Sequence, residues 1–136
     1  MQKLNSASLQ FSKRRIAISK DHDAHWAPNI DIYCTETGLV IKVELAGMQR
    51  ENLELSVEGN RLHISGQRPD GCRPPKCKFF VMEINYGAFG RIIEVPEGCD
   101  LSEGKACYQN GFLRIDVPYA SAPSRPRTIM VSDDQA

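Results

Sequence analysis

The side chains of this sequence with the most obvious chemistry are its five cysteines, Cys34, Cys72, Cys77, Cys99 and Cys107. Cys72 and Cys77 lie close together in Cys-Arg-Pro-Pro-Lys-Cys, where two thiolates in a loop could bind zinc or form a redox pair. Their separation is wider than the two residues common in zinc knuckles, and no second close pair of Cys or His follows. An odd number of cysteines also argues against a closed disulfide framework. We therefore favour free thiols and expect no metal.

The histidines offer no better candidate for catalysis. His22, Asp23 and His25 could contribute to a metal site, but they have no further ligands nearby, so a polar linker is the favoured interpretation. The sequence has no Gly-rich phosphate loop, no Gly-x-Ser-x-Gly elbow and no His-Glu-x-x-His motif. We expect a protein that is not an enzyme and that uses no cofactor.

Charge and length limit the remaining function classes. The 136 residues carry 17 basic and 17 acidic side chains, so no net charge steers the protein toward nucleic acid or an anionic membrane. No apolar run approaches the roughly 20 residues of a membrane span, and residues 1–20 lack the apolar region of a secretion signal. We expect one domain with tails, located in the cytoplasm.

The elements that would carry these side chains are predicted to be strands. From Trp26 onward, short β-branched runs alternate with turn signals, as in an all-β sandwich or barrel. Leu113, Ile115 and Val117 alternate with charged residues, so this run should have one buried face, and the Asn-Gly pair before it predicts a tight hairpin. The predicted strands are residues 29–33, 39–45, 53–58, 62–66, 87–95, 105–109 and 113–117.

Three segments do not fit a strand pattern. Residues 1–25 mix apolar and basic side chains without a clean period and read as a mobile arm, a reading preferred to a short membrane-surface helix. Prolines between residues 68 and 77 exclude a central strand and predict a long loop that leads into the apolar residues 79–82. The tail from Tyr119 contains prolines and small residues and should be extended.

Ile129 and Val131 stand out in that tail. Two β-branched residues spaced two apart point to the same side of an extended segment, so they could fill two pockets at the sheet edge of a neighbouring molecule. They could equally form a last strand on their own domain. The residues alone leave both options open.

Over roughly residues 26–131 the sequence resembles the small heat shock proteins, which contain an α-crystallin domain, and in particular their bacterial and plant members. The resemblance rests on six motifs in the family's order: Trp26-Ala-Pro-Asn-Ile-Asp-Ile-Tyr33, Val43-Glu-Leu-Ala-Gly47 followed by Glu51, Leu62-His-Ile-Ser-Gly-Gln-Arg68, Glu83 with Tyr86-Gly-Ala-Phe-Gly-Arg91 and Val95-Pro96, Ala106 with Asn110-Gly-Phe-Leu113, and Ile129-Met-Val131. Ala46 and Ile84 stand where the family usually has proline and arginine, and both ends are short for the family, which bears on the size of the assembly.

The resemblance implies an immunoglobulin-like sandwich of two antiparallel sheets over residues 26–118, an N-terminal arm over 1–25 and a C-terminal extension over 119–136. It also implies that Lys78 to Met82, within the loop 68–83, cross as a strand to a partner's sheet, and we prefer this to packing within one chain. The dimer interface would then include Phe79, Phe80, Val81, Glu83 and Arg91. Glu83 is the candidate partner of Arg91, because an unpaired buried charge is costly, although Arg91 could instead face solvent.

The family likeness further implies that Ile129 and Val131 insert between the strands 53–57 and 105–109 of a neighbouring dimer. The groove candidates are Leu53, Leu55, Val57, Ala106 and Tyr108. Burying two such side chains gives about 3 to 6 kcal/mol before ordering costs, so the contact should be reversible. The implied function is that of an ATP-independent chaperone, a holdase, that binds partly unfolded client proteins and works through reversible oligomerisation of dimers.

Two alternatives use the same residues differently. A monomeric co-chaperone or adaptor with a related sandwich would not need the Ile-x-Val tail or the long loop. A thiol- or zinc-dependent switch protein would use Cys72, Cys77 and Cys107, and would be excluded by an absence of metal together with five free thiols.

Overall fold

The computed structural model describes residues 16–71, 73–121 and 131 of the chain. Eight strands and two short 3₁₀ turns follow one another along these residues. They are β1 (Ala17–Lys20), β2 (Ile30–Cys34), β3 (Gly38–Glu44), η1 (Arg50–Asn52), β4 (Leu53–Glu58), β5 (Arg61–Arg68), β6 (Gly87–Glu94), η2 (Leu101–Glu103), β7 (Lys105–Gln109) and β8 (Phe112–Pro118). Within the described ranges, neither helical turn has the length and apolarity that a membrane span requires.

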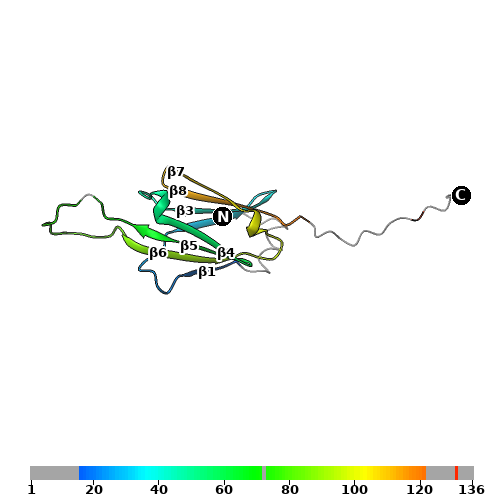
Figure 1. The fold of residues 1–136 in the computed structure, drawn as a ribbon, viewed down its shortest axis with the longest axis horizontal. Coiled ribbons are helices and arrows are strands. Elements are labelled where there is room, and N and C mark those ends of the chain that lie inside the picture. Colours follow the sequence, from blue (N-terminus) through cyan, green and yellow to red (C-terminus); the bar gives the residue numbers. More distant parts are fainter. Residues whose placement is uncertain (1–15, 72, 122–130, 132–136) are drawn as a thin grey trace, which may run out of the picture.

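The strands form two antiparallel sheets of four strands each. One sheet has the order β1-β6-β5-β4 and the other the order β2-β3-β8-β7, and the two lie face to face as the two layers seen in Figure 1. Strands β4 to β6 are a meander, whereas β3 and β8 pair over a long sequence separation. The expected two-sheet antiparallel sandwich is confirmed.

The core lies between the sheets because each strand contributes its alternate apolar side chains to that space. Leu113, Ile115 and Val117 of β8 are buried, whereas Arg114 and Asp116 between them are exposed, as the alternation predicts. Asn110 and Gly111 before this strand have φ of 52° and 83°, the positive values that a tight hairpin turn needs. The buried face of the strand 113–117 therefore packs against the opposite sheet.

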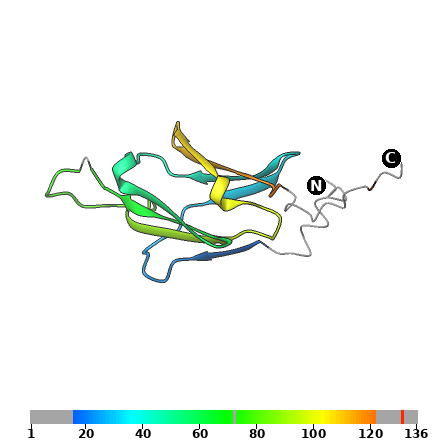
Figure 2. The ribbon, with the colours of Figure 1, turned by 45° about the vertical axis from the view of Figure 1, so that its right-hand side comes forward.

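The body of the protein begins earlier than the sequence indicated. Strand β1 lies within residues 1–25, which were expected to be a mobile arm, and pairs with β6 from Ala17 to Lys20. Figure 2 shows it along the lower border of its layer. All four of its side chains are exposed, so it leaves no alternating apolar signal in the sequence. Ala24, just after this strand, is buried.

The body also extends past residue 118, where the domain was expected to end. Cys99 and Tyr119 form an antiparallel bridge, and Ala120 donates its N–H to the carbonyl of Gly98 over 2.7 Å. The Tyr119 hydroxyl donates to the carbonyl of Thr35 over 2.9 Å. The first residues of the predicted extension are therefore attached to both the turn after β2 and the loop before η2.

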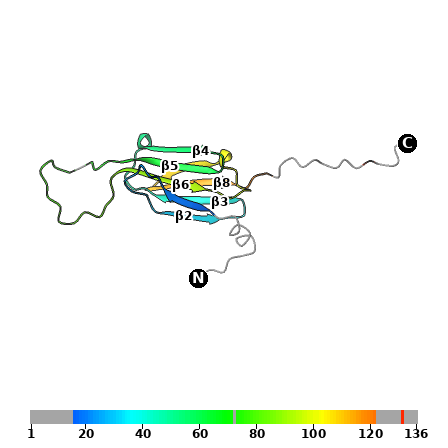
Figure 3. The same cartoon turned by 90° about the horizontal axis from the view of Figure 1, so that it is seen from below.

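The long loop between β5 and β6 projects from one end of the sandwich, as Figures 1 and 3 show at the left. Its described residues contain no strand, in agreement with the prediction from its prolines.

Candidate assembly interfaces

The projecting loop carries a run of exposed apolar side chains, which we name the apolar loop segment, Phe79 to Ile84. Phe80 is 103% exposed and Val81 is 69% exposed, and Phe79, Met82 and Ile84 are also largely accessible. The guanidinium of Arg73 lies over the Phe79 ring, 4.6 Å from its centroid, and Arg73 pairs with Asp70 in the same loop. In the single chain these side chains therefore do not pack against the sandwich. A contiguous exposed apolar run of this kind marks an interaction surface.

The observed contact of the Arg91 side chain differs from the expected pairing with Glu83. Its Nε donates to the carbonyl of Pro28 over 2.8 Å, in the lead-in to β2. Among the residues that the structure describes, no ion pair joins Arg91 to Glu83, whose side chain is exposed on the loop. A backbone carbonyl thus holds the guanidinium inside one chain, and Glu83 is free to meet a charge elsewhere.

The two sheets present four strand edges, those of β1 and β4 in one sheet and β2 and β7 in the other. An unpaired edge offers a row of N–H and C=O groups to another chain. A cavity of about 330 Å³ separates the returning arm of the loop, Glu83 to Asn85, from the residues Trp26 to Asn29 that lead into β2. The apolar loop segment and the β2 edge therefore border the same end of the molecule.

The groove candidates line the space between the edges of β4 and β7. Leu55 is directly opposite Ile64, and Ala106 is opposite Ile115; both partners are buried core residues. Residues opposite one another on antiparallel strands share a face, so Leu53, Leu55, Val57, Ala106 and Tyr108 face the space between the sheets. Val57 is 48% exposed, which leaves apolar surface accessible at this flank.

Tyr108 also has a structural role that its place in the sequence did not indicate. Its hydroxyl donates to the carbonyl of Leu45 over 2.6 Å and accepts the N–H of Met48 over 3.2 Å. The phenol thus joins β7 to the turn that follows β3. It fixes one end of the groove instead of offering its hydroxyl to a ligand.

A polar contact holds the segment after β1 on its sheet. Nε2 of His63, on β5, lies 2.8 Å from the carboxylate of Asp21. The backbone N–H of Asp23, which donates to this carboxylate, lowers the pKa of Asp21, and the contact with His63 acts in the same direction. Nothing in the sequence pattern predicted this pair, because the two residues are far apart along the chain.

The thiols do not form a site in the described residues. Cys34, Cys77 and Cys107 are exposed free thiols, and burial raises the pKa of the Cys99 thiol. Cys72 lies outside the described residues, so the alternative in which it pairs with Cys77, which the sequence did not favour, lies outside them as well. Over the ranges that are described, no group of three or more His, Cys, Asp or Glu residues could hold a metal ion.

The tail motif is only partly within the described residues. Ile129 lies outside them, and the Val131 side chain is 86% exposed. The expectation that these two side chains dock into a neighbouring groove remains a prediction.

Comparison with known proteins identifies a family match and relatives of this chain. Residues 31–132 match the model of the Hsp20/alpha crystallin family. The chain is 28% identical over 93 residues to Spore protein SP21 of Stigmatella aurantiaca. The matched region covers 68% of this chain and 55% of that protein. It is 31% identical over 115 residues to the 18.0 kDa class I heat shock protein of Daucus carota, with coverage of 84% and 68%. The chain thus spans between 55% and 68% of the length of these two curated relatives.

Solved structures give the same result for the fold. A small heat-shock protein from Xylella fastidiosa superimposes with a TM-score of 0.69 and 28% identity, over 80% of this chain and 99% of that one. HspA from Xanthomonas axonopodis superimposes with a TM-score of 0.64 and 28% identity, over 71% and 96%. The Xylella protein is described as having a distinct high order structure.

Proposed function

Because the chain belongs to the Hsp20/alpha crystallin family, we propose that it is a cytoplasmic holdase, an ATP-independent chaperone that binds partly unfolded proteins and limits their aggregation. The proposal assigns it no catalytic step and no cofactor. Its working parts are apolar surfaces that are covered in an assembly and exposed when the assembly opens.

The observation that carries the proposal is the exposure of the apolar loop segment. A fully accessible phenylalanine followed by valine and methionine on a projecting loop is unfavourable in water unless something covers it. We assign the cover to a second copy of the chain, whose β2 edge would receive residues 78–82 as an added strand. The exchange is reciprocal in a two-fold dimer, so each loop would cover the partner's edge.

Arg91 supports this placement of the exchanged strand. Its guanidinium lies at the lead-in to β2 and keeps donors that the Pro28 carbonyl does not use. In the exchanged dimer, Glu83 of a second copy would approach β2 and could pair with Arg91. Such a pair is partly shielded from solvent and would fix the register of the exchange.

A second, weaker contact would link dimers. Ile129 and Val131 of one dimer would enter the groove between β4 and β7 of another, where Val57 is exposed and Leu55 is half-buried. Burial of two such side chains provides about 3 to 6 kcal/mol before ordering costs, so the link opens readily when temperature or client concentration changes. Opening it exposes the groove to the apolar segments of unfolding proteins.

Suppression of client aggregation tests this proposal. Light scattering of a thermolabile enzyme such as citrate synthase, heated with and without the purified chain and with no nucleotide present, should show lower scattering at equimolar chain. The matched control is an equal concentration of serum albumin. Unchanged scattering, or suppression that requires added ATP, would refute the holdase assignment.

A further inference from the structure

Arg68 is the last residue of β5 and stands at the point where the long loop leaves the sandwich. It pairs across the sheet with Gly87, the first residue of β6, so it faces the point where the loop returns. Its side chain reaches three segments that are distant in sequence. Those segments are Trp26 in the lead-in to β2, Ala46 in the turn after β3, and Asn85 and Tyr86 on the returning arm of the loop.

The polar contacts of Arg68 close the loop. Nε and Nη2 both donate to the carbonyl of Asn85, over 2.9 and 2.6 Å, and Nη1 is 3.4 Å from the carbonyl of Ala46. Two N–H groups of a rigid planar fork thus meet one carbonyl oxygen on the returning arm. The outgoing end of the loop is thereby tied to the incoming end.

The guanidinium of Arg68 also contacts two aromatic rings. Its central carbon is 4.4 Å from the ring centroid of Trp26 and 5.8 Å from that of Tyr86. Trp26 is itself held, because its indole N–H donates to the carbonyl of Gly87 over 3.2 Å and its ring packs 5.2 Å from Phe89. An arginine stacked on an aromatic ring whose own position is fixed has little freedom to move.

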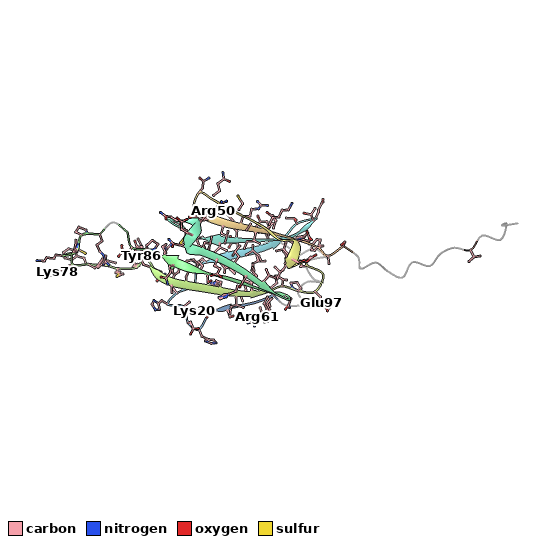
Figure 4. All side chains as sticks on the ribbon, in the orientation of Figure 1. Lys20, Arg50, Arg61, Lys78, Tyr86 and Glu97 are labelled. Atoms are coloured by element: carbon pink, nitrogen blue, oxygen red, sulfur yellow. The ribbon has the colours of Figure 1, made fainter. Side chains whose placement is uncertain are left out.

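Figure 4 shows how these contacts sit relative to the loop. Tyr86 lies at the root, beside the body of the sandwich, and Lys78 lies at the far tip, next to the apolar loop segment. A small rotation at the root therefore becomes a large displacement at the tip. The direction in which residues 78–82 point depends on how firmly the root is held.

We propose that Arg68, through Asn85, Trp26 and Tyr86, is the positioning residue that fixes the root of the loop 69–85 and sets the direction in which residues 78–82 are presented to a second copy of the chain. This inference rests on the exchanged dimer of the proposed function. Arg68 touches neither the partner strand nor a client in this scheme. It acts by reducing the conformations that the loop must give up when it pairs.

The chemistry of the site requires arginine and not only a positive charge. A lysine ammonium can approach the Asn85 carbonyl, but it has no planar face to lie on Trp26 and no fixed pair of donors. Arg68→Lys therefore keeps the charge and removes the geometry. Arg61→Lys is the matched control, because Arg61 is on the same strand and pairs with Glu94 over 3.3 Å at the exposed end away from the loop.

The experiment measures three properties of the full chain and of each variant. Sedimentation equilibrium over a range of concentrations, fitted to single chains, dimers and larger assemblies of dimers, gives the Kd of the dimer. Urea unfolding below that Kd gives the stability of the single chain. Acrylamide quenching of Trp26 fluorescence reports the root of the loop directly, since Trp26 is the only tryptophan. Arg68→Lys should raise the dimer Kd about tenfold, because a loop that the guanidinium no longer holds in the single chain must be ordered when it pairs. It should also increase the quenching of Trp26, with little change in urea unfolding. Arg61→Lys should change none of the three.

Tyr86→Leu provides an independent variant, because it removes one aromatic face and leaves the guanidinium in place. It should raise the Kd by about two- to fivefold. The positioning role would be overturned if Arg68→Lys left the dimer Kd unchanged. It would also be overturned if the Kd rose only in proportion to a loss of single-chain stability. If the wild-type chain does not dimerise at any concentration, the exchanged dimer of the proposed function fails. In that case, increased quenching of Trp26 in Arg68→Lys would still show that Arg68 holds the root of the loop. Unchanged quenching would refute this role as well.

Discussion

Replacement of Phe80 by serine is expected to weaken the dimer strongly without affecting the fold. Phe80 is 103% exposed in the single chain, so its side chain contributes no packing to the sandwich. The free energy of unfolding of the single chain should therefore change by less than about 0.5 kcal/mol. If residues 78–82 are exchanged between copies, the same side chain is buried in the dimer.

The size of the effect follows from the area that the exchange removes from water. Full burial of one phenylalanine side chain stabilises by about 1.5 to 3 kcal/mol, and a two-fold dimer contains the contact twice, which gives about 3 to 6 kcal/mol per dimer. Since 1.4 kcal/mol corresponds to a factor of ten, the dimer Kd should rise about 10²- to 10⁴-fold.

Sedimentation equilibrium over a range of concentrations measures this Kd, and urea unfolding below the Kd measures the stability of the single chain. Phe112→Ser is the matched control, because Phe112 is a phenylalanine that is 40% exposed on β8, with the ammonium of Lys42 over its ring. The control should leave the Kd unchanged. A Phe80→Ser Kd within threefold of wild type would refute the assignment of the apolar loop segment to the dimer interface.

Three further changes test other parts of the account. Tyr108→Phe removes the hydroxyl that bonds Leu45 and Met48, so the free energy of unfolding should fall by about 1 to 3 kcal/mol in a urea titration, and an unchanged midpoint would contradict the structural role of that hydroxyl. Asp21 has a pKa below its ordinary 3.8, so its ionised form stabilises the fold above that pH and the contribution disappears as the pH falls through the lowered pKa. Asp21→Asn should therefore reduce the thermal midpoint at pH 7 and have little effect at pH 2, and a loss of equal size at both would contradict the assignment. Val57→Asp puts a charge on the accessible flank of β4, so light scattering should show dimers in place of larger particles, whereas an unchanged particle mass would exclude this groove as the tail site.

The sequence predicted the strands that have one buried and one exposed face. The runs from residue 29 to residue 117 correspond to β2 through β8, because alternation of side chains such as Leu113, Ile115 and Val117 is imposed by burial of one face. The sequence did not predict β1 because this strand has no buried face. Its four residues are all exposed, so only its backbone pairing with β6 defines it.

The sequence predicted only those parts of the candidate interfaces whose residues are neighbours along the chain. The part of the apolar loop segment from Phe79 to Met82 is a run of neighbouring apolar residues, so the sequence identified it. The cluster around Arg68 joins Trp26, Ala46 and Asn85, which are far apart along the chain, and nothing in the spacing of these residues shows that they meet. Similarly, Arg91 was expected to need a carboxylate, but the fold brings a carbonyl of Pro28 within reach.

The mass of the particle in solution, before and after deletion of residues 127–136, tests the central claim most directly. Light scattering coupled to size-exclusion chromatography should find the full chain in particles larger than a dimer of its 15.2 kDa copies. The truncated chain should have twice the mass of one truncated copy. A full-length chain that elutes as a single 15.2 kDa copy at every concentration would contradict both the exchanged loop and the docked tail.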